Sequence, residues 1–216
     1  LILGSRVWWG MGHVGNKPTQ AHSYYDLVRH EARENGNLTL CEVGFNGGHS
    51  AALFLMAAGR GAHLYMFEKG NNYTKTAHRL INRLFPGQMT LIMGYSETTL
   101  PAFVAKHGRV CDVMSIDGGH GRQAVVGDLT HAPKMCKPSA LMLLDDMTTK
   151  AACRPAVDDA ARKGVITGVT CTPDKVSVFS WRSRFATRPE QSGPYQMLPT
   201  AWCHARLAKD KLNAVV

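Results

Sequence analysis

The sequence predicts an α/β fold, in which a mostly parallel β-sheet carries helices on both of its faces. Short apolar, β-prone runs alternate with helical segments along most of the 216 residues. The runs read as strands are apolar on both sides, which is typical of a sheet buried under helices on each face. The last two predicted strands are joined by a short turn, so they should run antiparallel to each other. At this length we expect one domain with a sizeable core.

Apolar β-prone runs identify the strands, good helix formers identify the helices, and glycine or proline marks most of their ends. Pro18 in a first turn and Gly36 after a last turn bound the first helix, and Pro86-Gly87 stop the third. In chain order the predicted elements are helix 18–35, strand 39–43, helix 50–58, strand 64–68, helix 72–84, strand 89–93, helix 97–106, strand 111–116, helix 123–135, strand 140–144, helix 151–163, strand 165–170 and strand 175–181.

The last part of the chain does not follow the alternation of strands and helices. A turn at Thr172-Pro173-Asp174 joins the two last strands into a hairpin. A Pro/Gly-rich stretch follows, and then a predicted helix at 201–213. We therefore expect one domain over residues 1–182, with an N-terminal helical cap. A C-terminal extension over 183–216 would pack on that domain or mediate contacts.

The most informative stretch runs from the first predicted strand through a glycine-rich turn into a helix. Its pattern is Glu42-x-Gly44-x-x-x-Gly48. A glycine turn at the carboxyl end of a parallel strand lets a ligand lie against bare backbone. The spacing differs from G-x-G-x-x-G, whose glycines admit a pyrophosphate. It resembles the first motif of the class I S-adenosylmethionine-dependent methyltransferases, whose cofactor carries a sulfonium, an amine and a carboxylate but no phosphate.

Two further strand ends suit a bound nucleoside. Glu68 closes the second strand twenty-four residues after Gly44, near the interval at which an acid reaches ribose hydroxyls. Glu68 does not separate S-adenosylmethionine from NAD, and an ordinary strand-end acid is the other interpretation. Ser96 follows the third strand, and the resemblance places it beside the adenine. A helix N-cap is an equally good interpretation of Ser96.

Three carboxylates follow two neighbouring strands. Asp117 ends the fourth strand, and Asp145-Asp146 end the fifth. Gathering like charges is unfavourable unless a cation compensates, and oxygen ligands suit a hard divalent ion. The other interpretation is that one Asp caps a helix and the others face solvent.

These features together resemble the metal-dependent small-molecule O-methyltransferases, the group of the catechol and caffeoyl-coenzyme A enzymes. The resemblance is closer to their bacterial-type relatives with an Ile-Asp-Gly-x-His strand end, and it covers residues 12–181. It implies a Rossmann-like seven-stranded sheet whose last strand is antiparallel. It also implies S-adenosylmethionine as cofactor, Mg²⁺ or another divalent cation on Asp117, Asp145 and Asp146, and His120 with Asp117 as catalytic residues. The implied cofactor-binding residues are Val14, Gly15, Glu42, Gly44, Phe45, Asn46, Gly48, His49, Ser50, Glu68, Ser96 and Asp117. His120 replaces the lysine base of the catechol enzymes, so a catechol pocket does not carry over.

The predicted function is therefore magnesium-dependent methyl transfer from S-adenosylmethionine to a hydroxyl of a small molecule. Three alternatives stay open. A metal-independent methyltransferase would keep the cofactor site and use the carboxylates for structure. An NAD-dependent oxidoreductase would share Glu68 and the turn. A non-catalytic binding module would use the basic C-terminal third to dock a partner.

The composition limits the kinds of binding partner and the cellular compartment that we expect. The net charge is +9, and residues 150–216 hold eleven Lys or Arg against five Asp or Glu, which suits an acidic acceptor or a solvated surface. No nucleic-acid motif accompanies this charge, and no apolar run reaches the length of a membrane span. The six cysteines lack a C-x-x-C pair and are predicted to be reduced, buried thiols of a cytoplasmic protein. A targeting segment lost before Leu1 and a homodimer both stay open.

Overall fold

The computed structural model describes residues 17–72, 74–119, 121–147, 153–178 and 196–209, and helices and strands alternate through most of them. The helices are α1 (Pro18–Asn35), α2 (His49–Ala58), α3 (Thr74–Leu84), α4 (Ser96–His107), α5 (Arg122–Met135) and α6 (Cys153–Arg162). The strands are β1 (Thr39–Val43), β2 (His63–Glu68), β3 (Met89–Met93), β4 (Cys111–Ile116), β5 (Cys136–Leu144), β6 (Ile166–Val178) and β7 (Gln196–Leu207).

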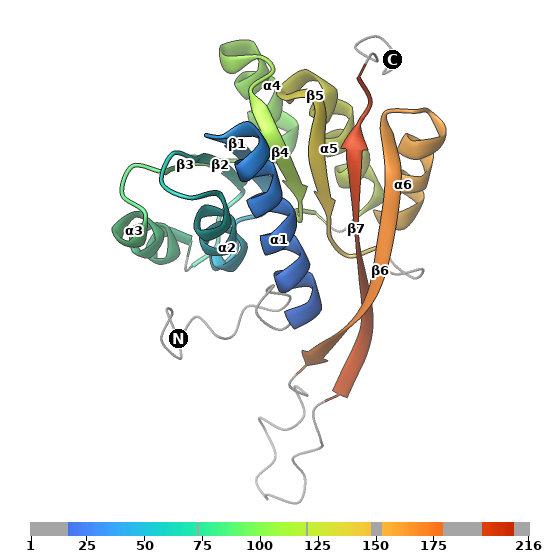
Figure 1. The fold of residues 1–216 in the computed structure, drawn as a ribbon, viewed down its shortest axis with the longest axis horizontal. Coiled ribbons are helices and arrows are strands. Elements are labelled where there is room, and N and C mark those ends of the chain that lie inside the picture. The colour runs from blue at the N-terminus through green and yellow to red at the C-terminus, as the bar shows by residue number, and fades with distance from the viewer. Residues whose placement is uncertain (1–16, 73, 120, 148–152, 179–195, 210–216) are drawn as a thin grey trace, which may run out of the picture.

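All seven strands belong to one sheet, in the order β3-β2-β1-β4-β5-β7-β6. Strands β1 to β5 pair in parallel, and β7 runs antiparallel between β5 and β6 (Figure 1). The predicted fold class is confirmed, including a mostly parallel sheet with an antiparallel last strand. Because β1 and β4 lie side by side while the chain between them crosses over, their carboxyl ends form the switch point at which such sheets bind ligands.

Helices α1, α2 and α3 cover one face of the sheet, and α4, α5 and α6 cover the other. The first core contains Tyr24 and Val28 of α1 and Phe54 of α2, packed on strand residues such as Leu40 and Leu64. The second core contains side chains of the other three helices, packed on alternate strand residues such as Val43 and Met114. Strands that are buried on both faces explain the nearly continuous apolar runs in the sequence.

The predicted hairpin at 165–181 is wrong. β6 is a single strand that runs through the predicted turn, with one irregularity of register between Thr167 and Thr170. Pro173 lies inside it opposite Ala201, which is tolerated because β6 is the edge strand of the sheet.

The antiparallel partner of β6 comes from the segment predicted as a helix at 201–213, so that prediction is also wrong. In β7 the side chains of Cys203, Ala205 and Leu207 are buried on one face of the sheet, an alternation of period two. Residues 141–144 of β5 offer β7 a ladder of backbone partners, which outweighs local helix propensity. This part of the predicted extension therefore completes the sheet, while residues 183–195 lie outside the described residues.

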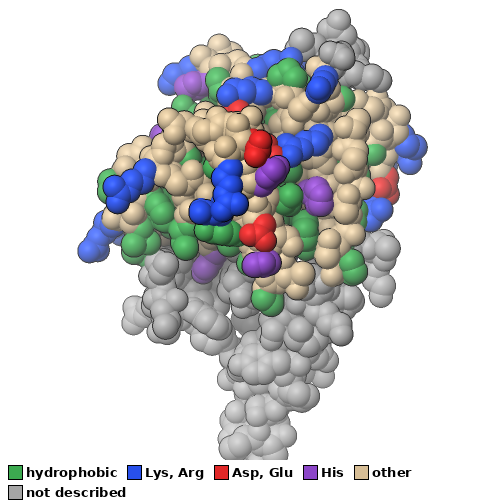
Figure 2. Space-filling view, in the orientation of Figure 1, with side chains coloured by type: hydrophobic (Ala, Val, Ile, Leu, Met, Phe, Trp, Pro, Cys, Tyr) green, Lys and Arg blue, Asp and Glu red, His purple; other side chains and the backbone are tan. Residues whose placement is uncertain are grey.

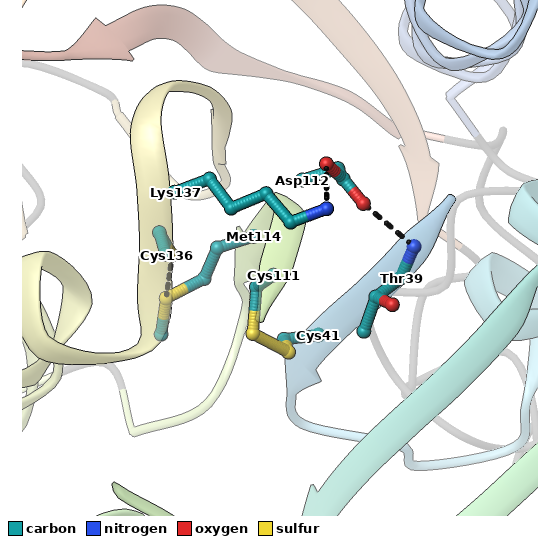
Figure 3. The surroundings of a disulfide bond; sticks show 7 residues. All are labelled: Thr39, Cys41, Cys111, Asp112, Met114, Cys136 and Lys137. Carbon is teal, nitrogen blue, oxygen red and sulfur yellow. Dashed lines mark hydrogen bonds and ion pairs between the residues drawn. A yellow bond between two sulfur atoms is a disulfide. The ribbon is translucent and has the colours of Figure 1, made fainter. Parts of the chain in front are cut away.

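The prediction that the cysteines are reduced is wrong for four of them. Cys41 of β1 is bonded to Cys111 of β4, as Figure 3 shows, and Cys171 of β6 is bonded to Cys203 of β7. The other two cysteines, Cys136 and Cys153, are buried and form no disulfide. The bonded residues lie 70 and 32 positions apart in sequence, so only strand pairing makes them neighbours. Cytoplasmic localisation stays a prediction, and the four bonded cysteines do not support it.

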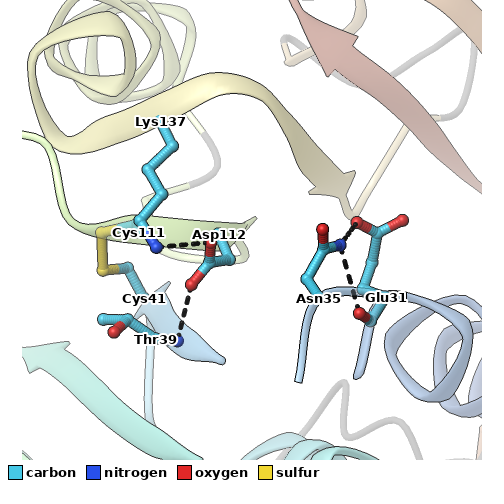
Figure 4. Close-up of polar contacts among 7 residues, drawn as sticks. All are labelled: Glu31, Asn35, Thr39, Cys41, Cys111, Asp112 and Lys137. Carbon is cyan, nitrogen blue, oxygen red and sulfur yellow. Dashed lines mark hydrogen bonds and ion pairs between the residues drawn. A yellow bond between two sulfur atoms is a disulfide. The ribbon is translucent and has the colours of Figure 1, made fainter. Parts of the chain in front are cut away.

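Polar contacts fasten the amino ends of the strands, opposite the edge described below. The Asp112 carboxylate accepts from the Thr39 backbone N–H at 2.9 Å and from the Lys137 ammonium at 2.8 Å (Figure 4). These bonds connect β1, β4 and β5. In the same view, the Asn35 amide donates to the Glu31 carbonyl at the end of α1. Among the described helices, none is long and apolar enough to cross a membrane.

Candidate active site

A cavity of about 490 Å³ opens at the carboxyl ends of β1, β2, β3 and β4. The turns that follow these strands supply most of its wall. Its lining residues are Val43, Gly44, Asn46, Phe67, Glu68, Lys69, Asn71, Gly94, Tyr95, Ser96, Glu97, Asp117, Gly118, Gly119 and Ala124. The size lies within the range of small-molecule sites.

The glycine turn after β1 is fixed by close backbone packing. Gly44 has φ +101°, and a Cβ there would lie 2.1 Å from the Asp117 carbonyl oxygen. The Asp117 N–H donates to the Val43 carbonyl at 2.9 Å, so β1 and β4 meet at this point. Gly48, with φ +76°, precedes α2, and a Cβ there would lie 2.9 Å from the Phe45 ring. The two glycines therefore permit the turn itself, in addition to exposing backbone to a ligand.

Glu68 holds this turn through its carboxylate. Its Oε2 accepts from the backbone N–H groups of Phe45 at 3.0 Å and Asn46 at 2.9 Å, and its Oε1 accepts from that of Gly70 at 2.8 Å. A carboxylate offers about four acceptor positions, so roughly one position stays available on Oε1. Because Glu68 also lines the cavity, that position can serve a ligand.

Glu42 lies beneath the turn and has no exposed surface. Among the described residues, neither of its carboxylate oxygens has a hydrogen-bond partner of good geometry. Burial raises the pKa of Glu42 to about 8, the Ser50 hydroxyl opposes the rise, and Asp145 adds to it. Glu42 is therefore largely protonated at neutral pH.

The structure brings the three predicted carboxylates together and adds a cation that the sequence analysis did not assign. The Lys17 ammonium donates to both oxygens of Asp145 at 2.8 Å and lies 3.8 Å from Oδ1 of Asp146. Lys17 is 3% exposed and Asp145 6%. Asp117 lies close enough to couple with them: burial raises its pKa well above the ordinary value, Asp145 and Glu42 add to the rise, and Lys17 opposes it.

Lys17 keeps its charge in this setting. Burial alone would lower the pKa of Lys17, but the ion pair and hydrogen bond with Asp145, together with Asp146, outweigh burial and raise it. Lys17 directly precedes Pro18 at the start of α1, and Gln20 and Tyr24 are buried on the following turns. A lysine at the start of a helix whose next two turns also point inward is the signal that could have identified it.

The donor set does not fit the predicted divalent ion in this arrangement. Within the described parts of the chain, no group of three or more His, Cys, Asp or Glu side chains is placed to hold a metal. Both oxygens of Asp145, the most buried of the three carboxylates, are taken by Lys17. The cation that compensates the cluster here is an ammonium.

The predicted cofactor residues divide into three sets. Those that line the cavity are Gly44, Asn46, Glu68, Ser96 and Asp117. Those that lie beside it, buried in the core or at the start of α2, are Glu42, Phe45, Gly48, His49 and Ser50. Those that lie outside the described residues are Val14, Gly15 and the predicted base His120.

Ser96 is the first residue of α4, whose N-cap position is held by Tyr95. The N-cap interpretation of Ser96 is therefore wrong. Burial raises the pKa of Asp128 in α5 to about 6. The hydroxyl of Ser96 donates a hydrogen bond to the Asp128 carboxylate, and this bond opposes the rise. The cavity also uses Lys69, Asn71 and Tyr95, which the sequence analysis missed. They lie just after the ends of β2 and β3, and this position is the only feature of the sequence that could have identified them as lining residues.

Comparison with known sequences adds a domain assignment. The family model described as a methyltransferase domain matches residues 41–147, from within β1 to just past β5. That span includes Glu42, the glycine turn, Glu68 and all three carboxylates. No curated protein matches the sequence.

Comparison with solved structures shows the same fold at low sequence identity. An O-methyltransferase from Bacillus cereus, in complex with SAH, is 15% identical with a TM-score of 0.61, covering 88% of this chain and 81% of that one. The O-methyltransferase TomG from Streptomyces achromogenes, involved in tomaymycin synthesis and in complex with SAM, is 16% identical with a TM-score of 0.60, covering 88% and 86%. A precorrin-6y C5,15-methyltransferase from Geobacter metallireducens is 13% identical with a TM-score of 0.59, covering 84% and 86%.

Proposed function

We propose that this chain transfers a methyl group from S-adenosylmethionine to a hydroxyl of a small molecule, because residues 41–147 match a methyltransferase domain and the sheet has the fold of solved O-methyltransferases. The cofactor supplies an electrophilic methyl group on a sulfonium. The observation that carries the proposal is the cavity at the switch point, with its acceptor position on Glu68 and its backbone wall at Gly44 and Gly118-Gly119.

The charges of the cavity favour S-adenosylmethionine over a dinucleotide. Among the described residues that line it, three are acidic, Glu68, Glu97 and Asp117, and one is basic, Lys69. Burial favours the neutral form of Asp117, but Glu68 and Glu97 still outweigh Lys69, and this balance attracts a cationic sulfonium and repels a pyrophosphate. The charges of the cavity therefore disfavour the NAD-dependent alternative, and the glycine turn also lacks the G-x-G-x-x-G pattern that this alternative would need.

This chain's own residues would hold and orient the cofactor. Glu68 would accept from a ribose hydroxyl through its remaining position, while Ser96 and Glu97 lie at the β3 end that the resemblance assigns to the adenine. Asp117 would close the cavity on the side of β4. His120 stays the predicted proton acceptor, because it follows Asp117 by three residues.

The acceptor remains a small hydroxylated molecule in this proposal. The structural neighbours include O-methyltransferases and a precorrin C5,15-methyltransferase, so the fold alone does not choose the acceptor atom. The resemblance over residues 12–181 favours oxygen. On the face in Figure 2, Lys and Arg side chains are spread out and form no continuous stripe of the kind that tracks a nucleic-acid backbone.

A magnesium-dependent form of this reaction stays a prediction. It would use Asp117, Asp145 and Asp146 as oxygen ligands, and it would require the Lys17 ammonium to leave Asp145. Binding by a catalytically silent module is the remaining alternative, and turnover separates it from the proposal.

Titration calorimetry and thermal melting test the cofactor assignment. We expect S-adenosylhomocysteine to bind with a Kd of micromolar order, about −8 kcal/mol, and to raise the melting temperature. NAD should do neither. Release of S-adenosylhomocysteine from S-adenosylmethionine, followed across phenols, alcohols and hydroxy acids, then tests transfer to oxygen. Stabilisation by NAD without any response to S-adenosylhomocysteine would refute the proposal.

A further inference from the structure

Lys17 contacts both oxygens of Asp145, one of the three carboxylates predicted to bind a metal. We propose that Lys17 is the built-in cation of this enzyme: its ammonium neutralises the Asp145–Asp146 pair and keeps divalent ions out, so methyl transfer needs no metal. This inference rests on the proposed function for its activity readout, but its main test is metal binding.

The geometry of the ion pair is the first argument. Lys17 Nζ lies 2.8 Å from both oxygens of Asp145, so it straddles the carboxylate as a chelated ion would. Mg²⁺ or Mn²⁺ binding there needs the same lone pairs, and the two cations would repel each other at such short range. Occupation by lysine and by a divalent ion therefore exclude each other.

The position of Lys17 is the second argument, since the surrounding structure holds it in place. Its carbonyl accepts from the Ala21 N–H at 2.9 Å, the first bond of α1. Two turns on, the Tyr24 ring packs edge-on against Trp202 with 5.2 Å between the ring centroids. Lys17 itself is 3% exposed, so its stem is packed and it is not a surface lysine that happens to reach a carboxylate.

A second lysine of this chain shows the contrast. Lys137 also pairs with an aspartate, Asp112, at 2.8 Å, but its side chain is half-exposed and it contacts only one oxygen of that carboxylate. Such a surface pair contributes little and excludes nothing. Lys137 therefore provides a matched control for Lys17.

Lys17 acts in this proposal as a positioning residue. Its charge holds Asp145 at the carboxyl end of β5, and the Asp145 carboxylate in turn accepts from the Asp146 N–H at 2.7 Å. The ammonium thus fixes the turn after β5 while leaving the cofactor cavity to the other strand ends.

The experiment uses the full chain, treated with EDTA and then dialysed, and titrates Mn²⁺ by electron paramagnetic resonance. Wild type and Lys137→Met should show no site tighter than about 1 mM, whereas Lys17→Met should gain one site at least about tenfold tighter. Lys17→Arg should gain none, because it restores the cation. The double variant Lys17→Met/Asp145→Asn should lose the new site. Far-UV circular dichroism checks that each variant is folded.

The Mn²⁺ titration of wild type tests the proposal even if Lys17→Met does not fold. One Mn²⁺ bound by wild type at or below about 100 µM, and lost in Asp145→Asn, would overturn the proposal, as would a folded Lys17→Met that binds no Mn²⁺. Methyl transfer by wild type should be unchanged by EDTA, and its abolition would also overturn it. Failure of S-adenosylhomocysteine to bind would instead refute the proposed function and leave the metal titration interpretable.

Discussion

Glu68→Gln is the sharpest probe of how the glycine turn after β1 is held. The carboxylate accepts three backbone N–H groups at 2.8–3.0 Å, and these come from both the glycine turn and the turn after β2. A glutamine keeps one carbonyl oxygen, which can still serve the N–H groups of Phe45 and Asn46. Its NH₂ group can only donate, so it would face the Gly70 N–H as donor against donor.

The magnitude follows from the number of bonds. Losing one bond to a charged acceptor costs about 1.5–3 kcal/mol, and the two surviving bonds lose their charge assistance. For a chain of this length that corresponds to a fall in Tm of roughly 3–12 °C. Glu68→Ala leaves all three N–H groups without this acceptor, and its Tm should fall further.

Thermal melting with and without S-adenosylhomocysteine gives both readouts. Glu34→Gln, an exposed acid of α1, is the control and should melt with wild type. The free acceptor position on Glu68 is also lost in the glutamine variant, so its affinity for S-adenosylhomocysteine should fall about tenfold. A Glu68→Gln protein that melts within about 1 °C of wild type would refute the structural role assigned to these bonds.

Three further predictions follow from backbone, charge and cross-links. Gly44→Ala should destabilise by about 2–6 kcal/mol in urea unfolding, because its Cβ would lie 2.1 Å from the Asp117 carbonyl oxygen; an unchanged midpoint would contradict this. The folded state of Glu42 holds a proton up to about pH 8, against about 4.5 when unfolded, so wild-type stability should fall as pH rises through this window. Glu42→Gln should remove that fall in a series of melts from pH 5 to pH 8.5, and parallel Tm curves would contradict it. Cys41 and Cys111 lie 70 residues apart, so replacing both with Ala should remove about 4 kcal/mol of stability in urea unfolding; an unchanged midpoint would contradict the cross-link.

The sequence predicted the first eleven elements closely because their signals are local. Strands 39–43, 89–93 and 111–116 and helix 18–35 were placed at the observed bounds, since apolar runs and Gly or Pro at their ends suffice to mark them. The hairpin prediction is wrong because Pro173 suggests a turn, and the last predicted helix is wrong because the tail favours helix locally. In both segments the pairing with distant strands decides the structure. Cys203 and Ala205 have partners in β5, Leu207 has one in β6, and these pairings set their alternation.

The candidate site divides along the same line. Gly44, Glu68 and Asp117 could be predicted because each closes a strand, and parallel strands bring their carboxyl ends to one edge. The pairing of Lys17 with Asp145 could not be predicted, because the two residues lie 128 positions apart and only the packing of α1 brings them together. The two disulfide bonds could not be predicted for the same reason.

By itself, then, the sequence determined the alternating α/β order, the edge of the sheet at which the cavity opens, and Glu68 and Asp117 among the acids that line it, because hydrophobic period and strand-end chemistry depend on local sequence. Only the tertiary structure decided which cation neutralises Asp145, that Glu68 spends most of its acceptor capacity on the turn, and which strand lies beside β5. Each of these depends on contacts between segments far apart in the chain, where burial and the available backbone partners, and not local propensity, set the lowest free energy.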